Sequence, residues 1–301
     1  MLESALESQF CGITFSSPII LASGILGVSG AILSRLASEG IGGLTSKSIG
    51  PEPRLGYTNP SVIEIGDGTV LNAVGLANPG IDEFIEEIPE IRHDGVPLII
   101  SIFGETDDEY AMMARKITDA GVDAVELNIS CPHAKVSSIG ADAYLTASVV
   151  SKVKEATSLP VFVKLNPNVT SIVDIALAAE NAGADAVVAI NTMRGMAIDV
   201  ETMKPILANK SGGVSGKALK PMAIKAVYDL YESLSIPIIG CGGVFSGLDI
   251  IEFLLAGARL VQIGTAFLNG LGIIKTMKNE LLDYMERHSV NSVMDLVGKG
   301  H

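Results

Sequence analysis

Residues 160–192 read PVFVKLNPNVTSIVDIALAAENAGADAVVAINT and contain the pattern that decides the fold. A proline opens a continuous apolar run, a helical stretch follows, and a glycine 23 residues after the proline opens a second apolar run. Both runs are apolar throughout rather than alternating, which is typical of strands covered on both faces. Proline is tolerated where a strand begins, because its missing N–H breaks no ladder bond there. The stretch therefore predicts two strands joined by a helix.

The same unit recurs along the chain, with each glycine 20 to 24 residues after its proline. The proline phrases begin at Pro18, Pro97, Pro160 and Pro237, and the glycine phrases at Gly40, Gly121, Gly183 and Gly257. The segments between them, such as 107–120 and 143–157, carry apolar residues at helical spacing. Eight strands alternating with helices in about 250 residues predict an α/β fold of the (β/α)8 TIM barrel type. A doubly wound sheet is the alternative, but it is not expected to repeat eight such units.

Two of the units are longer than the others. The loops after the second and sixth predicted strands carry the insertions 49–80 and 192–216, which exceed what a plain crossover needs. Insertions at the carboxyl ends of barrel strands fall on the face where active sites lie. Both are rich in Gly and contain Asn, and the second also contains Lys204 and Lys210, so we favour a role in the site over surface decoration. Because no linker divides the chain, residues 1–301 are predicted to form a single domain.

Composition and charge exclude several classes of protein. The 34 acidic against 21 basic residues give a net charge of −13, which speaks against binding the phosphates of nucleic acids. The three cysteines are too far apart for a disulfide scaffold, a cysteine-rich zinc site or an iron–sulfur cluster held by this chain alone. Residues 8–34 are uncharged and long enough to cross a bilayer, but their Ser, Gly and Pro content predicts a strand and loops. We expect a cytoplasmic protein that binds neither a membrane nor nucleic acid.

Polar side chains follow the predicted strands at the end where barrel active sites lie. They are, in chain order, Ser23, Lys47, Ser48, Ser101, Asn128, Ser130, Cys131, Lys164, Asn191 and Thr192. No carboxylate stands at a strand end and the nearest histidine is His133, which argues against a glycosidase carboxylate pair and a metal site. A lysine buried at a strand end is costly unless an anion pairs with it. Lys47 and Lys164, together with the asparagines, therefore predict a site for an anionic or amide-rich planar ligand.

The last two strand ends are rich in glycine. Gly242, Gly243 and Gly264 with Thr265 follow the seventh and eighth strands, where backbone amides and helix N-termini cradle phosphate in many barrels. No complete G-x-G-x-x-G pattern occurs, so a Rossmann nicotinamide site is not expected.

The cysteines invite different interpretations. Cys131 lies just beyond a strand end, where a thiol with a lowered pKa acts as a nucleophile or general base; a small semi-buried residue is the alternative. Cys11 and Cys241 are interpreted as packing residues.

These residues belong to a series of ordered motifs. The chain carries ASG at 22–24, TSKS at 45–48, LNAVGLANPG at 71–80, ELNISCP at 126–132, VKLNPN at 163–168, INT at 190–192, PILANKSGGVSGKALKP at 205–221, IPIIGCGGV at 236–244 and IGTA at 263–266. Along nearly its whole length the chain resembles the class 1 dihydroorotate dehydrogenases, most closely the 1B catalytic subunit. The motifs are specific when taken together and in this order, although each alone is weak.

The resemblance implies an FMN-containing barrel that oxidises dihydroorotate to orotate in pyrimidine synthesis. Cys131 would remove a proton from C5 of dihydroorotate while a hydride passes from C6 to N5 of FMN. The residues that would hold the pyrimidine and its carboxylate are Lys47, Asn72, Ala73, Val74, Gly75, Leu76, Asn128, Asn191 and Thr192. Those that would hold FMN are Ser23, Lys47, Ser48, Ser101, Asn128, Lys164, Ile190 and Gly216, with Gly242, Gly243, Gly264 and Thr265 at its phosphate.

Two positions depart from the family pattern. His133 stands where the family usually has an asparagine that contacts orotate, and Ser101 stands where relatives often have an asparagine beside the flavin. A neutral imidazole still donates one hydrogen bond, but it titrates near neutral pH.

The 1B resemblance also implies partners. They are a homodimeric core and a second subunit carrying FAD and a [2Fe–2S] cluster, which together form a heterotetramer that passes electrons to NAD⁺. A fumarate-dependent class 1A homodimer is one alternative, and a flavoenzyme acting on another pyrimidine, such as dihydrouracil, is a second. A third, from another class, is a non-redox aldolase in which Lys164 forms a Schiff base.

Overall fold

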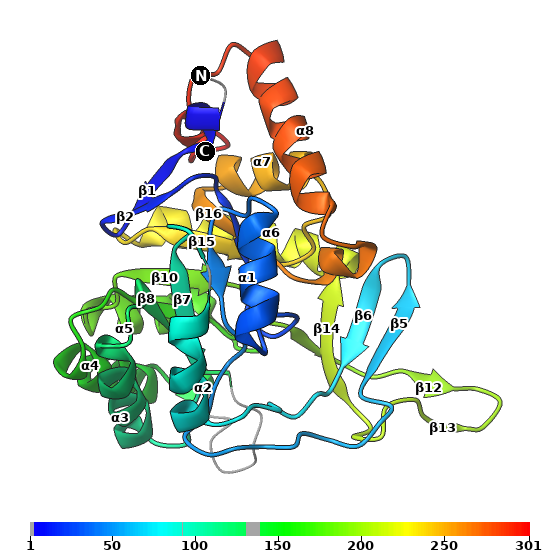
Figure 1. The fold of residues 1–301 in the computed structure, drawn as a ribbon. Coiled ribbons are helices and arrows are strands. Elements are labelled where there is room, and N and C mark those ends of the chain that lie inside the picture. The colour runs from blue at the N-terminus through cyan, green and yellow to red at the C-terminus, as the bar shows by residue number, and fades with distance from the viewer. Residues whose placement is uncertain (1–2, 92, 131–138) are drawn as a thin grey trace.

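The computed structural model of the chain describes residues 3–91, 93–130 and 139–301. Within these residues, eight parallel strands form a barrel (Figure 1). In chain order they are β3 (Ile19–Leu21), β4 (Leu44–Thr45), β7 (Leu98–Ile102), β8 (Ala124–Asn128), β9 (Val161–Lys164), β10 (Ala186–Ala189), β15 (Ile238–Cys241) and β16 (Ala258–Ile263). Each begins within a few residues of a proline or glycine in the repeat, so the prediction of the eight strands is confirmed.

The barrel closes between its first and second strands. Neighbouring strands pair in the order β3-β16-β15-β10-β9-β8-β7-β4, and the Leu21 amide of β3 donates to the Gly43 carbonyl beside β4 at 2.9 Å. A helix follows every barrel strand, which confirms the (β/α)8 class. The helices are α1 (Gly30–Ser38), α2 (Ile81–Glu87), α3 (Asp107–Thr118), α4 (Ala143–Ala156), α5 (Ile172–Asn181), α6 (Lys220–Ser233), α7 (Gly247–Leu255) and α8 (Ile273–Arg287).

Local side chains define where several helices begin. Thr106, Asp142 and Ser171 each accept a hydrogen bond from a backbone amide in the first turn of α3, α4 and α5. Ser246 and Asp249 form a reciprocal capping box at the start of α7. Such caps satisfy amides that have no partner inside the helix. The turns from strand to helix are therefore encoded close to the residues that form them.

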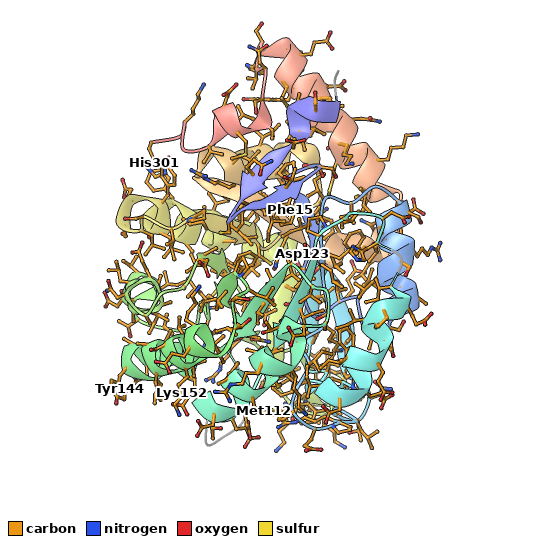
Figure 2. All side chains as sticks on the ribbon, turned by 60° about the vertical axis from the view of Figure 1, so that its left-hand side comes forward. Phe15, Met112, Asp123, Tyr144, Lys152 and His301 are labelled. Carbon is orange, nitrogen blue, oxygen red and sulfur yellow. The ribbon has the colours of Figure 1, made fainter. Side chains whose placement is uncertain are left out.

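An N-terminal hairpin closes the bottom of the barrel. Strands β1 (Ser8–Phe10) and β2 (Ile13–Phe15) are antiparallel, and Phe10 and Phe15 pack with the inward apolar residues of the barrel strands. The Phe10 ring makes edge-to-face contacts with Phe15 and Phe162, at centroid distances of 6.3 and 5.4 Å. Figure 2 labels Phe15 on this hairpin, and the residue is fully buried. Because this end is filled with rings, ligands can approach the barrel only from the opposite end.

The two long insertions meet outside the barrel. Segment 49–80 holds β5 (Val62–Gly66) and β6 (Thr69–Asn72), and segment 192–216 holds β11 (Met193–Gly195) and β14 (Gly212–Gly216). They pair in the order β11-β14-β6-β5, so strands from two distant segments form one antiparallel sheet. Figure 1 shows this sheet at one side of the barrel. It brings Asn72 and Thr192 to the same end of the molecule as the barrel mouth.

A short hairpin extends from that sheet. Its strands are β12 (Ile198–Asp199) and β13 (Lys204–Pro205), which project farthest from the barrel in Figure 1. Ile198, Val200 and Met203 are exposed on it, the last two by 81% and 82%.

Single-turn 3-10 helices complete the described elements. They are η1 (Glu3–Leu6), η2 (Ile88–Glu90), η3 (Ile139–Ala141), η4 (Lys217–Leu219), η5 (Thr265–Asn269) and η6 (Val293–Leu296). No helix within the described residues is long and apolar enough to cross a membrane.

Candidate active site

The carboxyl ends of the barrel strands bring many of the predicted site residues to one mouth. Ser48 lies just beyond β4, Ser101 lies within β7, and Asn128 ends β8. The Ser48 and Ser101 hydroxyl oxygens are 3.0 Å apart, and Asn128 Nδ2 donates to Ser48 Oγ at 2.9 Å. All three side chains are buried, and their hydrogen bonds hold the Asn128 amide in one orientation. Ser101 therefore supports Asn128 through Ser48.

A second group of hydrogen bonds joins β8 to the end of β10. Asn128 Oδ1 accepts from Ser130 Oγ at 2.6 Å and from Asn191 Nδ2 at 3.3 Å. The Asn191 side chain also donates to Ser130 Oγ, and its own Oδ1 accepts from the Thr192 amide at 2.7 Å. The mouth therefore presents amide and hydroxyl groups that complement the N–H and C=O groups of a planar ring.

The antiparallel sheet adds a third set of predicted residues. Asn72 is paired with Gly213 in the sheet, and its Nδ2 donates to the Gly213 carbonyl at 3.1 Å. Thr192 packs against the same glycine, since a Cβ added at Gly213 would lie 2.2 Å from Thr192 Oγ1. Gly213 thus lets Asn72 and Thr192 approach one another from two insertions.

Residues 73–76 continue from Asn72 along the edge of this sheet. The Ala73 amide donates to the Ser61 carbonyl at 2.7 Å, and the Val74 carbonyl accepts from the Tyr57 amide at 3.0 Å. Gly75 and Leu76 both have positive φ, of 76° and 56°. A Cβ at Gly75 would lie 2.8 Å from the Tyr57 amide nitrogen, so this close approach requires glycine.

Lys47 is half-buried at the mouth. Its side chain makes no ion pair with a carboxylate of the described residues, and burial lowers its pKa. A partly desolvated ammonium without a counter-ion favours an anionic ligand, because the ligand's charge compensates the lost hydration.

Lys164 is more deeply buried, with 3% of its surface exposed. Its ammonium donates to Gln262 Oε1 at 2.6 Å and lies 3.4 Å from Ser23 Oγ and 3.7 Å from Cys241 Sγ. Burial acts to lower the pKa of Lys164, whereas Cys241 and Glu126 act to raise it, and the net direction is upward. This lysine therefore carries a charge in the barrel interior, directly beneath Ser23.

Cys11 and Cys241, which the sequence predicts to be packing residues, have different surroundings. Cys11 packs under the barrel, where its thiol donates to the Asp185 carbonyl at 3.3 Å and burial raises its pKa to about 12. Cys241 packs against the same apolar cluster, and burial raises the pKa of its thiol as well. Both are packing residues, as the sequence suggests, although Cys241 also contacts the Lys164 ammonium.

The glycine-rich ends of β15 and β16 lie side by side, because these strands are neighbours in the barrel. Gly242 and Gly243 have φ of 134° and 73°, and a Cβ at Gly264 would meet nothing closer than Ala22 Cβ at 3.5 Å. A Cβ at Gly242 would lie 2.9 Å from Ala223 Cβ, and one at Gly243 would lie 2.6 Å from the Lys220 amide nitrogen. Packing against α6 already explains these two glycines, and Gly264 is the one with room beside its backbone.

The backbone amides at the N-terminus of α7 already donate hydrogen bonds to carboxylates. The amides of Phe245 and Ser246 donate to Asp249 Oδ2 at 2.8 and 2.9 Å, and the Gly247 amide donates to Glu280. A phosphate at this end is thus left with the amides of the preceding glycines and of Thr265, and not those of the helix.

Gly216 and Ile190 differ in what surrounds them. A Cβ at Gly216, where φ is 87°, would lie 1.9 Å from the Gly68 carbonyl oxygen, so pairing of β14 with β6 already explains this glycine. Ile190 follows β10 and contributes to a pocket of about 400 Å³ between the β9–α5 loop and α6. Pro167, Met193 and Met222 line the same pocket, which therefore lies beside the mouth rather than at its centre.

Two predicted positions lie outside the described residues. They are Cys131, the expected general base, and His133, the departure from the family pattern. Among the described residues, no group of three His, Cys, Asp or Glu side chains is arranged to hold a metal ion.

Comparison with known proteins identifies the family. The model of the dihydroorotate dehydrogenase family matches residues 5–285. The chain belongs to the dihydroorotate dehydrogenase family. The resemblance drawn from the motifs is thereby confirmed.

Individual relatives cover the chain from end to end. It is 47% identical over 308 residues to a protein of Methanocaldococcus jannaschii, with all of both chains covered. It is 49% identical over 292 residues to one of Methanocella arvoryzae, with 96% of each covered, and 47% identical over 301 residues to one of Pyrococcus horikoshii, with 99% and 98% covered. Each of these is called dihydroorotate dehydrogenase B (NAD⁺), catalytic subunit. This dihydroorotate dehydrogenase is therefore most like class 1B, as the motifs indicate.

Sequence reasoning missed two polar residues inside this dihydroorotate dehydrogenase barrel. Glu126 is fully buried within β8 and Gln262 is 1% exposed within β16, both before the strand ends. The signal that could have found them is a single polar residue within an otherwise apolar run, as in AVEL and LVQI. Such residues are rarely buried without a partner.

Proposed function

We propose that this chain oxidises dihydroorotate to orotate in de novo pyrimidine synthesis, using FMN bound at the mouth of the barrel. The observation that carries the proposal is the hydrogen-bonded pair of Asn128 and Asn191 side-chain amides at the mouth of the barrel, where the half-buried Lys47 also follows a strand end. Dihydroorotate is a ring that offers amide groups and one carboxylate, and it becomes planar when it is oxidised to orotate. The amides complement the ring, and an ammonium without a protein counter-ion complements the carboxylate.

The residues at the mouth fit FMN. Gly24 has φ of 102° with no atom within 4 Å of an added Cβ, and a Cβ at Gly264 would make only ordinary contacts, the nearest at 3.5 Å, so a flat group can lie against the backbone there. Ser23, Ser48, Ser101 and Ile190 would border the isoalloxazine, with Lys164 beneath it. The glycine amides at the ends of β15 and β16 and that of Thr265 would bind the phosphate.

The chain's own residues divide the chemistry between them. When bound, FMN supplies the acceptor for the hydride that leaves C6 of the substrate. Cys131 removes the proton from C5 as general base. Lys47 holds the substrate carboxylate together with residues 73–76, while Asn72, Asn128, Asn191 and Thr192 orient the ring.

Electrons leave through a partner in this proposal. The relatives' name, which includes NAD⁺ and a catalytic subunit, supports an NAD⁺-linked assembly over a fumarate-dependent enzyme. We expect a homodimeric core of this chain with a second subunit that carries FAD and a [2Fe–2S] cluster. The few, widely separated cysteines of this chain are consistent with a reducing cytoplasm.

An anaerobic titration with dihydroorotate tests the proposal. The purified protein should contain about one FMN per chain, and its visible flavin absorbance should bleach as dihydroorotate is added. If dihydrouracil bleaches the flavin and dihydroorotate does not, dihydrouracil is the substrate in place of dihydroorotate. A protein that neither contains nor takes up FMN would overturn the proposal.

Replacement of the proposed base gives the matching kinetic test. Cys131→Ala should slow flavin reduction by dihydroorotate about 10²–10⁴-fold, the usual contribution of a general base, and leave FMN bound. Cys11→Ala serves as the control, because Cys11 lies at the opposite end of the barrel. Equal rates in Cys131→Ala and the unmodified protein would remove Cys131 from this role.

A further inference from the structure

A row of three polar side chains crosses the interior of the barrel. Glu126 Oε2 on β8 accepts from Gln262 Nε2 on β16 at 2.6 Å, and Gln262 Oε1 accepts from the Lys164 ammonium on β9 at 2.6 Å. The three residues are 0%, 1% and 3% exposed. Apolar side chains of the inner cluster, including Phe162 and Leu260, lie on the same strands below them. The row is thus a polar layer in an otherwise apolar core, and the proposed reaction leaves Glu126 and Gln262 without a role.

The chemistry of the end groups orients the central amide. An ammonium only donates, so it must face the oxygen of Gln262, and the amide nitrogen is then turned toward Glu126. A carboxylate accepts that N–H. Gln262 therefore links an anion to a cation, and reversing the amide would break both bonds.

The Glu126 carboxylate and the Lys164 ammonium are each costly to bury without the other. Removing a single charge from water costs several kcal/mol, and removing one member of a buried pair leaves the other uncompensated. Glu126 Oε1 has no hydrogen-bond partner among the described residues, which makes an unbalanced carboxylate there still more costly. Glu126 and Lys164 are consequently a bridged ion pair.

The Lys164 ammonium has three polar neighbours among the described residues. Besides Gln262, it faces Ser23 at 3.4 Å, where β3 gives way to the mouth, and Cys241 at 3.7 Å on β15. The titratable groups that face it are thus Glu126 and Cys241. Burial raises the pKa of the Cys241 thiol, so Glu126, which Gln262 links to Lys164, is the counter-ion that the geometry favours.

We propose that Glu126 is a positioning residue which, acting through Gln262, keeps the Lys164 ammonium charged and directed at the pyrimidine edge of the flavin. The proposal rests on the proposed FMN site, since it is there that a fixed cation would act on the flavin. A cation at that edge favours electron uptake by the flavin. Glu126 would thus control the flavin without touching it.

The charge state of Lys164 can be measured in the purified protein, whatever its flavin content. Lysine labelled with ¹³C at Cε reports titration by NMR, and the Lys164 signal is identified by its loss in Lys164→Met. The unmodified protein should keep Lys164 protonated throughout the range from about pH 6 to 9. In Glu126→Gln, which keeps the shape and the acceptor, the signal should pass through its midpoint inside that range, because a buried lysine without a counter-ion loses its proton at lower pH.

Two further variants keep the test decisive. Glu86→Gln removes one charge from the exposed face of α2 and should titrate like the unmodified protein. Gln262→Met leaves both charges and removes the link, so it should also lower the Lys164 midpoint, and it replaces Glu126→Gln if that variant does not fold. Titration of Lys164 in both barrel variants as in the unmodified protein would overturn the proposal.

The flavin supplies an independent readout. In Glu126→Gln the reduction potential of bound FMN should show an added break at the pH where Lys164 titrates, with the potential falling above it, and Glu86→Gln should show none. A shifted Lys164 midpoint without this break would show that the pair is purely structural. If the protein cannot bind FMN, the proposed function is wrong. The NMR titration does not depend on FMN, so it still decides whether Glu126 keeps Lys164 protonated.

Discussion

The two lysines at the barrel mouth have different environments, and each environment predicts a different function. Lys164 has a hydrogen-bonded link to a buried carboxylate, and its pKa is raised. Lys47 has no carboxylate partner among the described residues, and burial lowers its pKa from 10.5. The first lysine is compensated by the protein, and we expect the second to be compensated by a ligand. Sequence analysis treats them alike because both end an apolar run.

We therefore expect Lys47 to lower the free energy of unfolding while it supports the binding of an anionic ligand. Because its folded pKa is lowered, the folded protein binds fewer protons than the unfolded chain between that value and 10.5. The destabilisation is thus fully present below the lowered pKa and disappears as the pH rises toward 10.5. Lys47→Met should raise the free energy of unfolding at pH 7 by roughly 0.5–1 kcal/mol and weaken orotate binding about 10–100-fold.

Denaturant unfolding and equilibrium binding of orotate check this expectation. Lys275→Met, on the exposed face of α8, is the control and should change neither quantity. A Lys47→Met protein that is less stable than the unmodified one at pH 7 would contradict the assignment of Lys47 to a ligand.

At the scale of elements, β14 connects the two insertions to the substrate site. Gly213 on β14 contacts both Asn72 and Thr192, and an added Cβ would lie 2.2 Å from Thr192 Oγ1. Gly213→Ala should push Thr192 aside and lower kcat/KM for dihydroorotate about tenfold or more, with the FMN content unchanged.

Steady-state kinetics and the flavin absorbance test this second expectation. Gly272→Ala is the matched control, because an added Cβ there has no atom within 4 Å. Equal kcat/KM values for the two variants would show that β14 does not position Thr192 for the substrate.

The hairpin β1–β2 contributes to stability and not to the site. Phe10 is 1% exposed and fills the closed end of the barrel with Phe15 and Phe162. Phe10→Ala should lower the free energy of unfolding by about 3–5 kcal/mol, the usual cost of emptying a buried ring position. FMN affinity of the folded variant should be unchanged.

Urea unfolding and a flavin-binding titration measure these two effects. Leu55→Ala removes a fully exposed apolar side chain and should cost little. A large loss of FMN affinity in folded Phe10→Ala would mean that the bottom of the barrel controls the mouth.

At the scale of the whole molecule, the projecting hairpin β12–β13 gathers several exposed apolar side chains of the insertion 192–216 on one element. Val200 and Met203 are 81% and 82% exposed on this hairpin, which projects away from the barrel in Figure 1. Exposed apolar side chains on a projecting element are typical of protein interfaces. We expect this hairpin to contribute to the assembly of the homodimeric core.

Replacing both side chains by aspartate tests that expectation. The unmodified chain should sediment as a dimer or a larger assembly, and the Val200→Asp, Met203→Asp protein at a lower mass, because buried charges without partners oppose association. Tyr144→Asp is the control, on α4 at the periphery of the barrel in Figure 2. An unchanged mass in the double variant would place the interface elsewhere.

The barrel was predictable from sequence because its units are local. Each strand and the helix after it lie within one repeat, and every strand carries apolar residues on both faces, so the pattern of Pro18, Gly40 and their later counterparts identifies all eight. The polar residues at the strand ends were predictable for the same reason. Parallel strands in a barrel share one mouth, so the positions of Asn128 and Asn191 at their strand ends predict that they meet, and their side chains are hydrogen-bonded at 3.3 Å.

Tertiary structure alone decided which distant residues meet. Gln262 and Glu126 are 136 residues apart, and Lys164 and Gln262 are 98 apart, so only closure of the barrel brings the three side chains into one layer. Pairing of β6 with β14 likewise depends on two insertions separated by most of the barrel. Hydrophobic periodicity identifies elements and their buried faces, because these follow from neighbours along the chain. It does not identify partners inside the core, because they depend on register and on the closing contacts of the whole sheet.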